Sequence, residues 1–135
     1  MRLIQNLGVL VAIEDDKLAG FVCLATINPL PGHPVVKAMY ESFPNQIFNH
    51  EPLTEYRVFI YGPVLINSDW RGKGILKKLF AAVKDFTKKD YELGTAFIND
   101  KNLHSLAVHT QGLGMAALTP FNYHGETFQL VVFQV

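Results

Sequence analysis

The chain is poor in the features that mark several protein classes. It contains one cysteine, Cys23, so no internal disulfide can form, which excludes a disulfide-stapled secreted scaffold. No signal peptide is visible, and no apolar run approaches the roughly 20 residues that a membrane-spanning helix needs. Twelve Lys and Arg balance twelve Asp and Glu, which gives zero formal charge. We therefore expect a cytoplasmic protein with no nucleic-acid partner and no membrane partner.

The sequence also lacks a metal-binding pattern. His33, His50, His104 and His124 have no Cys or carboxylate at the spacing of a zinc site, so we predict no structural metal. Cys23 lies within an apolar run with no histidine near it in sequence. This setting is typical of a buried spacer rather than of a nucleophile.

Apolar and aromatic residues are plentiful. Hydrophobic residues make up 49% of the 135 residues, and they include ten Phe and five Tyr. A chain of this length and composition buries a sizeable core, and it shows no internal repeat. The sequence therefore predicts a single globular domain over residues 1–135.

Residues 57–86 organise the rest of the chain. Residues 57–66 are rich in β-branched and aromatic side chains and predict a strand that the pair Gly62-Pro63 interrupts. Apolar residues recur at helical spacing over 75–86 and predict an amphipathic helix. Between them, residues 71–74 (Arg-Gly-Lys-Gly) leave backbone amides uncovered at a helix N-terminus, where anions bind. This turn fits neither a Walker A loop nor G-x-G-x-x-G, and a purely structural turn is the alternative.

Before this stretch, the sequence predicts a hairpin and an irregular segment. The expected elements are strands over 7–13 and 18–27, an irregular Pro-rich connection over 28–34, a short helix over 35–43 between two prolines, and a loop over 44–55.

After the central helix, Gly94 is a plausible helix stop, and a short strand follows over 95–98. A second helix is predicted over 103–111 with Leu103, Leu106 and Ala107 facing inward. Strands are then expected over 115–120 and 127–135. The predicted fold class is α/β (α+β), with a mixed, mostly antiparallel central sheet that splays at the binding site and helices packed on its faces.

Two stretches resemble one known family. Arg71-Gly-Lys-Gly74-Ile-Leu76 resembles motif A, Gln/Arg-x-x-Gly-x-Gly/Ala, of the GNAT superfamily of acyl-CoA-dependent N-acyltransferases. Asn102, Ser105, His109 and Leu113-Gly-Met115 resemble its motif B. The chain departs from the pattern in four ways: Leu76 replaces a small residue, His109 stands where Tyr or Phe is usual, Met115 replaces Phe, and Gly112 lengthens the segment by one residue.

The resemblance implies acetyl-CoA as cofactor. The lost pairing at Gly62-Pro63 would leave main-chain groups free for the pantetheine arm and the thioester oxygen, while the glycine turn would hold the pyrophosphate. Asn102 is equally well explained as a helix N-cap. The cofactor-binding residues expected in this way are Val64, Leu65, Ile66, Arg71, Gly72, Lys73, Gly74, Ile75, Leu76, Asn102 and Ser105.

Three residues are candidates for the acid and base. A lysine-like amine has a pKa of about 10.4, so acyl transfer near neutrality benefits from a base. Family members often supply a Glu from the strand before the splay, but this chain has Phe59-Ile-Tyr61 there. Tyr61 is a candidate proton relay or packing residue, His109 a candidate acid or structural histidine, and Glu55 a candidate base or solvated loop charge.

The resemblance implies an N-acetyltransferase that acts on a primary amine of a small molecule or a protein. A non-catalytic CoA-binding or protein-interaction module is the alternative, and a plain nucleotide-phosphate binder is a third reading. The apolar strand at the C-terminus would leave an open edge unless it were covered, so a homodimer is possible.

The family usually has a first strand and two helices before the hairpin, and these helices help to enclose the acceptor. Only six residues precede Leu7. We treat residues 29–55 as an insertion that lies near the acceptor side. Either the start is truncated, or this insertion replaces that wall.

Overall fold

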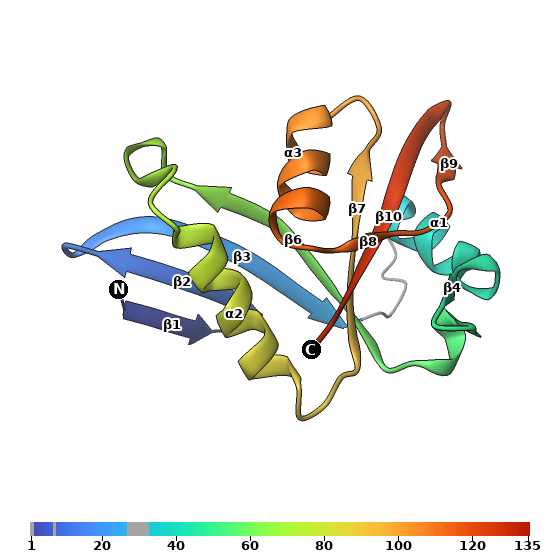
Figure 1. Cartoon of the computed structure of the whole chain (residues 1–135), viewed down its shortest axis with the longest axis horizontal. Helices are drawn as coiled ribbons and strands as arrows, with labels where there is room; N and C mark the ends of the chain where they lie inside the picture. The colour runs from blue at the N-terminus through green and yellow to red at the C-terminus, as the bar shows by residue number, and fades with distance from the viewer. Residues whose placement is uncertain (1, 7, 27–32) are drawn as a thin grey trace.

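The structure is a computed structural model that describes residues 2–6, 8–26 and 33–135. Its main feature is a sheet with the strand order β1-β2-β3-β6-β7-β10-β8, and β9 pairs with β10 (Figure 1). Among the described strands of this sheet, β6 and β7 are parallel and the other neighbours are antiparallel, which confirms the predicted fold class. The strands are β1 (Arg2–Asn6), β2 (Val9–Glu14), β3 (Lys17–Thr26), β6 (Val58–Ile66), β7 (Leu93–Asn99), β8 (Ala116–Ala117), β9 (Phe121–Tyr123) and β10 (Glu126–Gln134).

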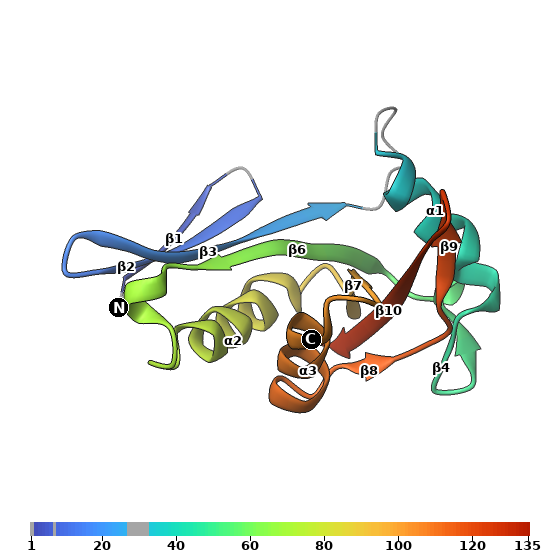
Figure 2. The same cartoon turned by 90° about the horizontal axis from the view of Figure 1, so that it is seen from above.

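Helices lie on both sides of this sheet. Figure 2 shows α2 and α3 together on one side, and α1 beyond the end of β3 on the other. The helices are α1 (Pro34–Ser42), α2 (Ile75–Thr87) and α3 (Leu103–Ala107), which continues into a π-helical turn over Val108–Gly112. Short 3₁₀ turns span Phe43–Asn45, Leu53–Glu55 and Ser68–Trp70, and a small hairpin pairs β4 (Ile47–Phe48) with β5 (Glu51–Pro52).

The two faces of the sheet bury two separate cores. Along β10, Val131 and Phe133 belong to the core beneath α2, while Leu130 and Val132 belong to the core beneath α1. This alternation follows from the two-residue period of a strand, which sends successive side chains to opposite faces. The near-continuous apolar sequence of β10 is therefore explained by burial on both faces rather than by a shared edge.

The predicted hairpin is confirmed. Strands β2 and β3 pair antiparallel around a turn at Asp15 and Asp16, both of which have positive φ. Residues 2–6, from which the sequence predicted nothing, form β1 at the edge beside β2. Leu7, Ile27 at the end of the second predicted strand, and residues 28–32 of the predicted irregular connection lie outside the described residues.

The predicted helix after Pro34 is also confirmed, as α1. The segment that contains it is fastened to the rest of the chain by Gln46, which is 1% exposed. The Gln46 side chain donates to the Thr119 carbonyl at 2.7 Å and accepts from the Thr119 N–H at 2.8 Å. It also donates to the Ser42 hydroxyl at 3.2 Å. These contacts hold α1 at a fixed place against the sheet.

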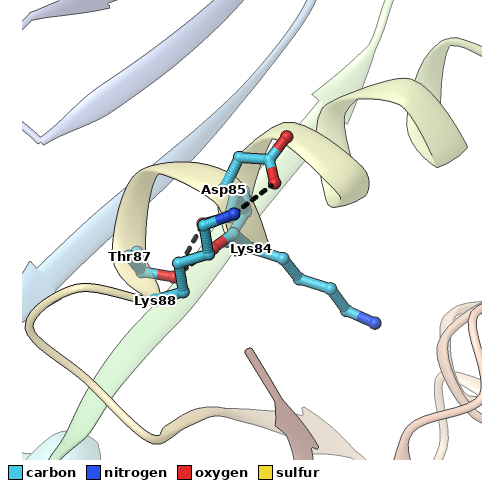
Figure 3. A network of polar contacts seen from close by, with 5 residues as sticks. Lys84, Asp85, Thr87 and Lys88 are labelled. Atoms are coloured by element: carbon cyan, nitrogen blue, oxygen red, sulfur yellow. Dashed lines mark hydrogen bonds and ion pairs between the residues drawn. The ribbon is translucent and has the colours of Figure 1, made fainter.

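The end of α2 is stabilised by local polar contacts (Figure 3). The Thr87 hydroxyl donates to the Val83 carbonyl at 2.7 Å, and Lys88 lies 3.5 Å from the Asp85 carboxylate. Lys84 points away from this pair and lies 4.7 Å from the centre of the Phe80 ring. The helix therefore ends at Thr87, well before the glycine that we expected to stop it.

Gly94 was wrongly predicted as a helix stop. It lies inside β7, where an added Cβ would overlap the rings of Phe133 and Phe59. Its small size is required by close packing between two aromatic rings that lie far from it in sequence.

Candidate functional site

The sheet splits between its two parallel strands. Strand β6 pairs with β3 from Phe59 to Ile66, but it pairs with β7 over Val58–Ile60 alone. Beyond Ile60 the two strands diverge, as Figure 1 shows. One residue of β3, Cys23, also faces two of β6 at this point, which is a β-bulge at the predicted break, Gly62-Pro63.

Ladder geometry decides which backbone groups beyond the bulge are free. The Asn67 N–H donates to the Ala19 carbonyl at 2.7 Å. Hydrogen-bonded and non-bonded pairs alternate along an antiparallel ladder, so Leu65 exchanges its hydrogen bonds with Phe21. The expectation that the main chain of Leu65 is free is therefore corrected.

The backbone groups of the two residues that flank Leu65 face the opposite direction. By the same alternation, the N–H and C=O of Val64 and Ile66 face away from β3, toward the split. The Ile66 carbonyl accepts a hydrogen bond from Arg71 Nε at 3.2 Å. This contact fixes the start of the glycine turn beside the open side of β6.

The glycine turn presents free amides. Gly72 and Gly74 have φ of 74° and 80°, a left-handed conformation that favours glycine. No side chain caps α2, and among the described residues the N–H groups of 72–76 have no hydrogen-bond partner. A Cβ on either glycine would meet no atom within 4 Å, so the turn faces open space. Lys73 and Lys77 are exposed beside it, and the turn is arranged to bind an anion.

Beneath the bulge, Tyr61 and His109 form a buried pair. Tyr61 is 3% exposed and His109 is 5% exposed. The Tyr61 hydroxyl lies 3.4 Å from His109 Nε2, and His109 Nδ1 lies 2.8 Å from the Ser105 carbonyl oxygen. Because a carbonyl only accepts, the proton is on Nδ1, and Nε2 accepts from the Tyr61 hydroxyl.

Burial keeps this pair neutral. It lowers the pKa of His109 and raises the pKa of Tyr61, since each charged form would lose its hydration. Each proton is directed at a partner inside the protein. His109 therefore stands in the structure as a neutral packing partner of Tyr61, with no proton directed outward.

The helix that holds His109 differs from the prediction. It is α-helical to Ala107 and then opens into a π-helical turn, so its inward face shifts. Leu103 is 73% exposed rather than buried, and Ala107 is exposed as well. A π turn accommodates one extra residue, in agreement with the added Gly112 in the sequence pattern.

Asn102 acts as the N-cap of this helix. Its side-chain oxygen accepts from the Ser105 N–H at 3.1 Å. The Ser105 hydroxyl lies 3.3 Å from His109 Nδ1. Both side chains therefore have local structural roles, in addition to the cofactor contacts expected from the motif.

Glu55 is not brought to the split. It is exposed in the 3₁₀ turn that precedes β6, whereas the bulge lies in the middle of that strand. The four residue steps from Val58 to Gly62 alone span about 13 Å at the usual strand rise. Glu55 is accordingly too distant to act as the base.

A pocket of about 330 Å³ adjoins the bulge. Its walls are residues 60–63 of β6, Ala25 and Thr26 at the end of β3, Phe97 of β7, and His33 and Val36 at the start of α1. None of the described residues that line it is a carboxylate. His33, Val36 and Phe97 were not predicted from the sequence, because nothing in their local patterns indicates that three distant segments meet.

Two further features are absent from the described part of the chain. No group of three or more His, Cys, Asp or Glu residues within it is placed to hold a metal ion. No described helix is long and apolar enough to cross a membrane.

Comparison with known proteins gives a consistent family. The family model described as acetyltransferase (GNAT) family matches residues 2–115. Among curated proteins, no relative matches the chain.

Solved structures share the fold at low identity. Ribosomal-protein-alanine N-acetyltransferase from Brucella melitensis superposes with a TM-score of 0.59 at 19% identity, over 94% of this chain and 68% of that one. A GNAT-family acetyltransferase from Streptococcus agalactiae gives 0.70 at 14% identity, over 95% and 65%. The protein yncA from Salmonella typhimurium, solved with its cofactor acetyl-CoA, gives 0.60 at 16% identity, over 93% and 63%. The chain thus spans about two thirds of the length of these structures.

Proposed function

The chain belongs to the GNAT acetyltransferase family, and from this premise we propose that it transfers an acetyl group from acetyl-CoA to a primary amine of a small molecule or a protein. The observation that supports this most directly is the row of unpartnered amides over 72–76, beside the open side of β6. A diphosphate is the kind of ligand that such a helix N-terminus attracts.

The residues present fit acetyl-CoA. The turn offers amides and lysines for the diphosphate, and the strand offers the backbone groups of Val64 and Ile66 for the pantetheine arm. A thioester near the bulge would supply an activated acetyl group. The Val64 N–H, which faces the split, is the donor best placed to polarise its carbonyl oxygen.

The chain also excludes water below the bulge. Tyr61 packs edge-on against Phe80, Phe133 and His109, with ring centres 5.6 to 6.1 Å apart. We assign His109 the role of holding Tyr61 in place, because both of its nitrogens are engaged inside the protein. Asn102 and Ser105, at the start of α3, remain proposed contacts of the carrier.

A specific observation favours the second candidate, a CoA-binding module without catalysis. The Tyr61–His109 pair directs no proton outward, and Glu55 lies far from the split. Such a module would bind CoA and acetyl-CoA equally well and would release no thiol with any amine.

The test measures binding and turnover separately. Thermal unfolding is recorded with acetyl-CoA, CoA and ATP side by side, because a ligand at 100 times its Kd stabilises the folded state by about 2.7 kcal/mol. We expect the midpoint to rise by several degrees with both CoA species and less with ATP. Thiol release is then measured with a panel of primary amines.

The outcomes separate the candidates. Stabilisation by CoA together with amine-dependent thiol release supports the acetyltransferase. Stabilisation without thiol release supports the binding module. Stabilisation by ATP equal to that by CoA indicates a general phosphate site, and the absence of any stabilisation refutes the proposed cofactor.

A further inference from the structure

The pocket beside the bulge has a chemistry of its own. Its lining residues Val36, Ile60 and Phe97 belong to the core beneath α1. Figure 2 shows α1 and α2 on opposite sides of the sheet. The pocket residues of β6, 60–63, are those at which the strand departs from β7. An acetyl group delivered at the bulge from the α2 side would therefore meet whatever occupies the pocket from the α1 side.

The lining residues that the structure describes are mostly apolar and carry no fixed charge. Val36, Ile60, Pro63 and Phe97 supply hydrophobic surface, and no Asp, Glu, Lys or Arg is among the lining residues. A charged substituent buried here would lose its hydration and gain no partner. The volume of the pocket, about 330 Å³, is at the small end of the range for ligand sites, so the pocket suits one small apolar group.

Within the described part of the chain, His33 is the titratable side chain lining the pocket that has no side-chain hydrogen bond or ion pair. His33 is exposed, and it is the N-cap residue of α1, where its side chain makes no capping hydrogen bond. It lines the pocket together with Gly62 and Pro63 of the bulge. The other titratable lining group, Tyr61, donates to His109. Lys37, one turn along α1, has a 67% exposed side chain that pairs with Glu41 at 3.9 Å, and β3, β6 and β7 contribute no charged group to the pocket.

We propose that the acceptor is a small primary amine whose apolar substituent lies in this pocket, and that His33 takes the proton from the attacking nitrogen. This inference rests on the proposed function. The amine, an ammonium ion near neutrality, first gives one proton to water. Its nitrogen lone pair then forms the C–N bond while the C–S electrons leave with sulfur. One N–H proton passes to the neutral His33 ring, and the thiolate takes a proton from water, giving an amide and free CoA. Because His33 is exposed, it returns its proton to solvent.

Three amines of equal length test the substrate class. Hexylamine, 1,6-diaminohexane and 6-aminohexanoate differ in whether the far end is apolar, cationic or anionic. We expect kcat/KM for hexylamine, from thiol release, to exceed the other two by at least tenfold. A charged amine used as well as hexylamine would overturn the apolar class.

A charge placed in the wall makes the same test from the protein side. Val36→Asp puts a carboxylate in the pocket. It should raise the ratio of kcat/KM for 1,6-diaminohexane to that for hexylamine by at least tenfold. Lys37→Asp puts one on the neighbouring exposed position and should leave the ratio unchanged. Equal ratios in the two variants would show that the amine does not lie against Val36.

The role of His33 is tested by its pH profile. Because the amine and the base must both be neutral, wild-type kcat/KM should fall steeply toward acid pH. In His33→Gln only the ionisation of the amine remains, so kcat should fall by about 100-fold and the acid limb should become less steep, with the acetyl-CoA stabilisation unchanged. His50→Gln, at an exposed turn, should keep the wild-type steepness. An acid limb as steep in His33→Gln as in wild type refutes His33 as the base.

The failure of this inference is distinguishable from that of the proposed function. If acetyl-CoA stabilises the protein and charged amines are acetylated, the proposed function stands and the acceptor class falls. If acetyl-CoA neither stabilises the protein nor acetylates any of the three amines, both are refuted.

Discussion

Replacement of His109 by Phe should change how stability depends on pH. The side chain is buried, and burial lowers its pKa below the ordinary value of 6.5. As the pH falls through 6.5, the unfolded chain takes up a proton that the folded chain does not. The folded state therefore loses stability toward acid until the pH reaches the folded-state pKa, below which the loss levels off.

The size of the effect follows from the contacts. One proton taken up only by the unfolded chain gives a slope of at most about 1.4 kcal/mol per pH unit. Above pH 7 the Phe variant lacks the acceptor for the Tyr61 hydroxyl and the donor to the Ser105 carbonyl. An unsatisfied buried group costs about 1–3 kcal/mol, so the variant should be less stable by about that amount. This gap should narrow as the pH falls below 6.5.

Urea unfolding of wild type and His109→Phe between pH 5 and 8 measures this gap. The difference between the two proteins removes the contribution of all other titrating groups. A gap that stays constant, or that widens toward acid, would refute the neutral buried histidine. In that case His109 would be charged in the folded protein, and its assignment as a packing partner would fall as well.

Three other substitutions test separate parts of the structure. Gly74→Ala should lower the free energy of unfolding by about 1–2 kcal/mol because residue 74 has a left-handed φ, and it should weaken CoA binding in a titration. Gly125→Ala, at a similar φ in the distant hairpin turn, should lower stability as much and leave CoA binding unchanged. Gln46→Leu should lower the free energy of unfolding in urea by about 1–3 kcal/mol, since it removes two hydrogen bonds to the main chain of Thr119, which is exposed and can bond to water instead; a loss below about 0.5 kcal/mol would contradict a stabilising role for these bonds. Wild type should lose stability above pH 10, because the folded state keeps the Tyr61 hydroxyl neutral while the unfolded chain ionises it, and Tyr61→Phe should lose less. Urea unfolding at pH 9 and 11 measures both losses, and equal losses in the two proteins would show that the hydroxyl is hydrated.

Local patterns predicted the elements that depend on neighbouring residues. The β2–β3 hairpin, α1 between its prolines, and the glycine turn before α2 were all predicted from sequence, because turn chemistry and hydrophobic period act over a few residues. The break at Gly62-Pro63 belongs to the same class. Each of these features is confirmed at or near its predicted residues.

Predictions failed where a distant contact overrides the local pattern. Gly94 has the position of a helix stop, but close packing by Phe59 and Phe133 explains it. Leu103 has the spacing of a buried residue, but the π-helical turn moves the inward face to His109. In both cases the deciding atoms lie on other elements, which a period along the chain does not report.

The candidate site also contains some features that the sequence predicts and others that depend on tertiary contacts. The sequence alone determined the glycine turn at 71–76, because glycines and a helix start suffice to leave amides free. Only the tertiary structure decided that Leu65 pairs with β3, that Tyr61 meets His109 across 48 residues, and that Glu55 is remote. It also decided that His33 and Val36 close an uncharged pocket beside the bulge. These features arise from strand register and from the placement of α1, and both depend on contacts between residues far apart in the chain.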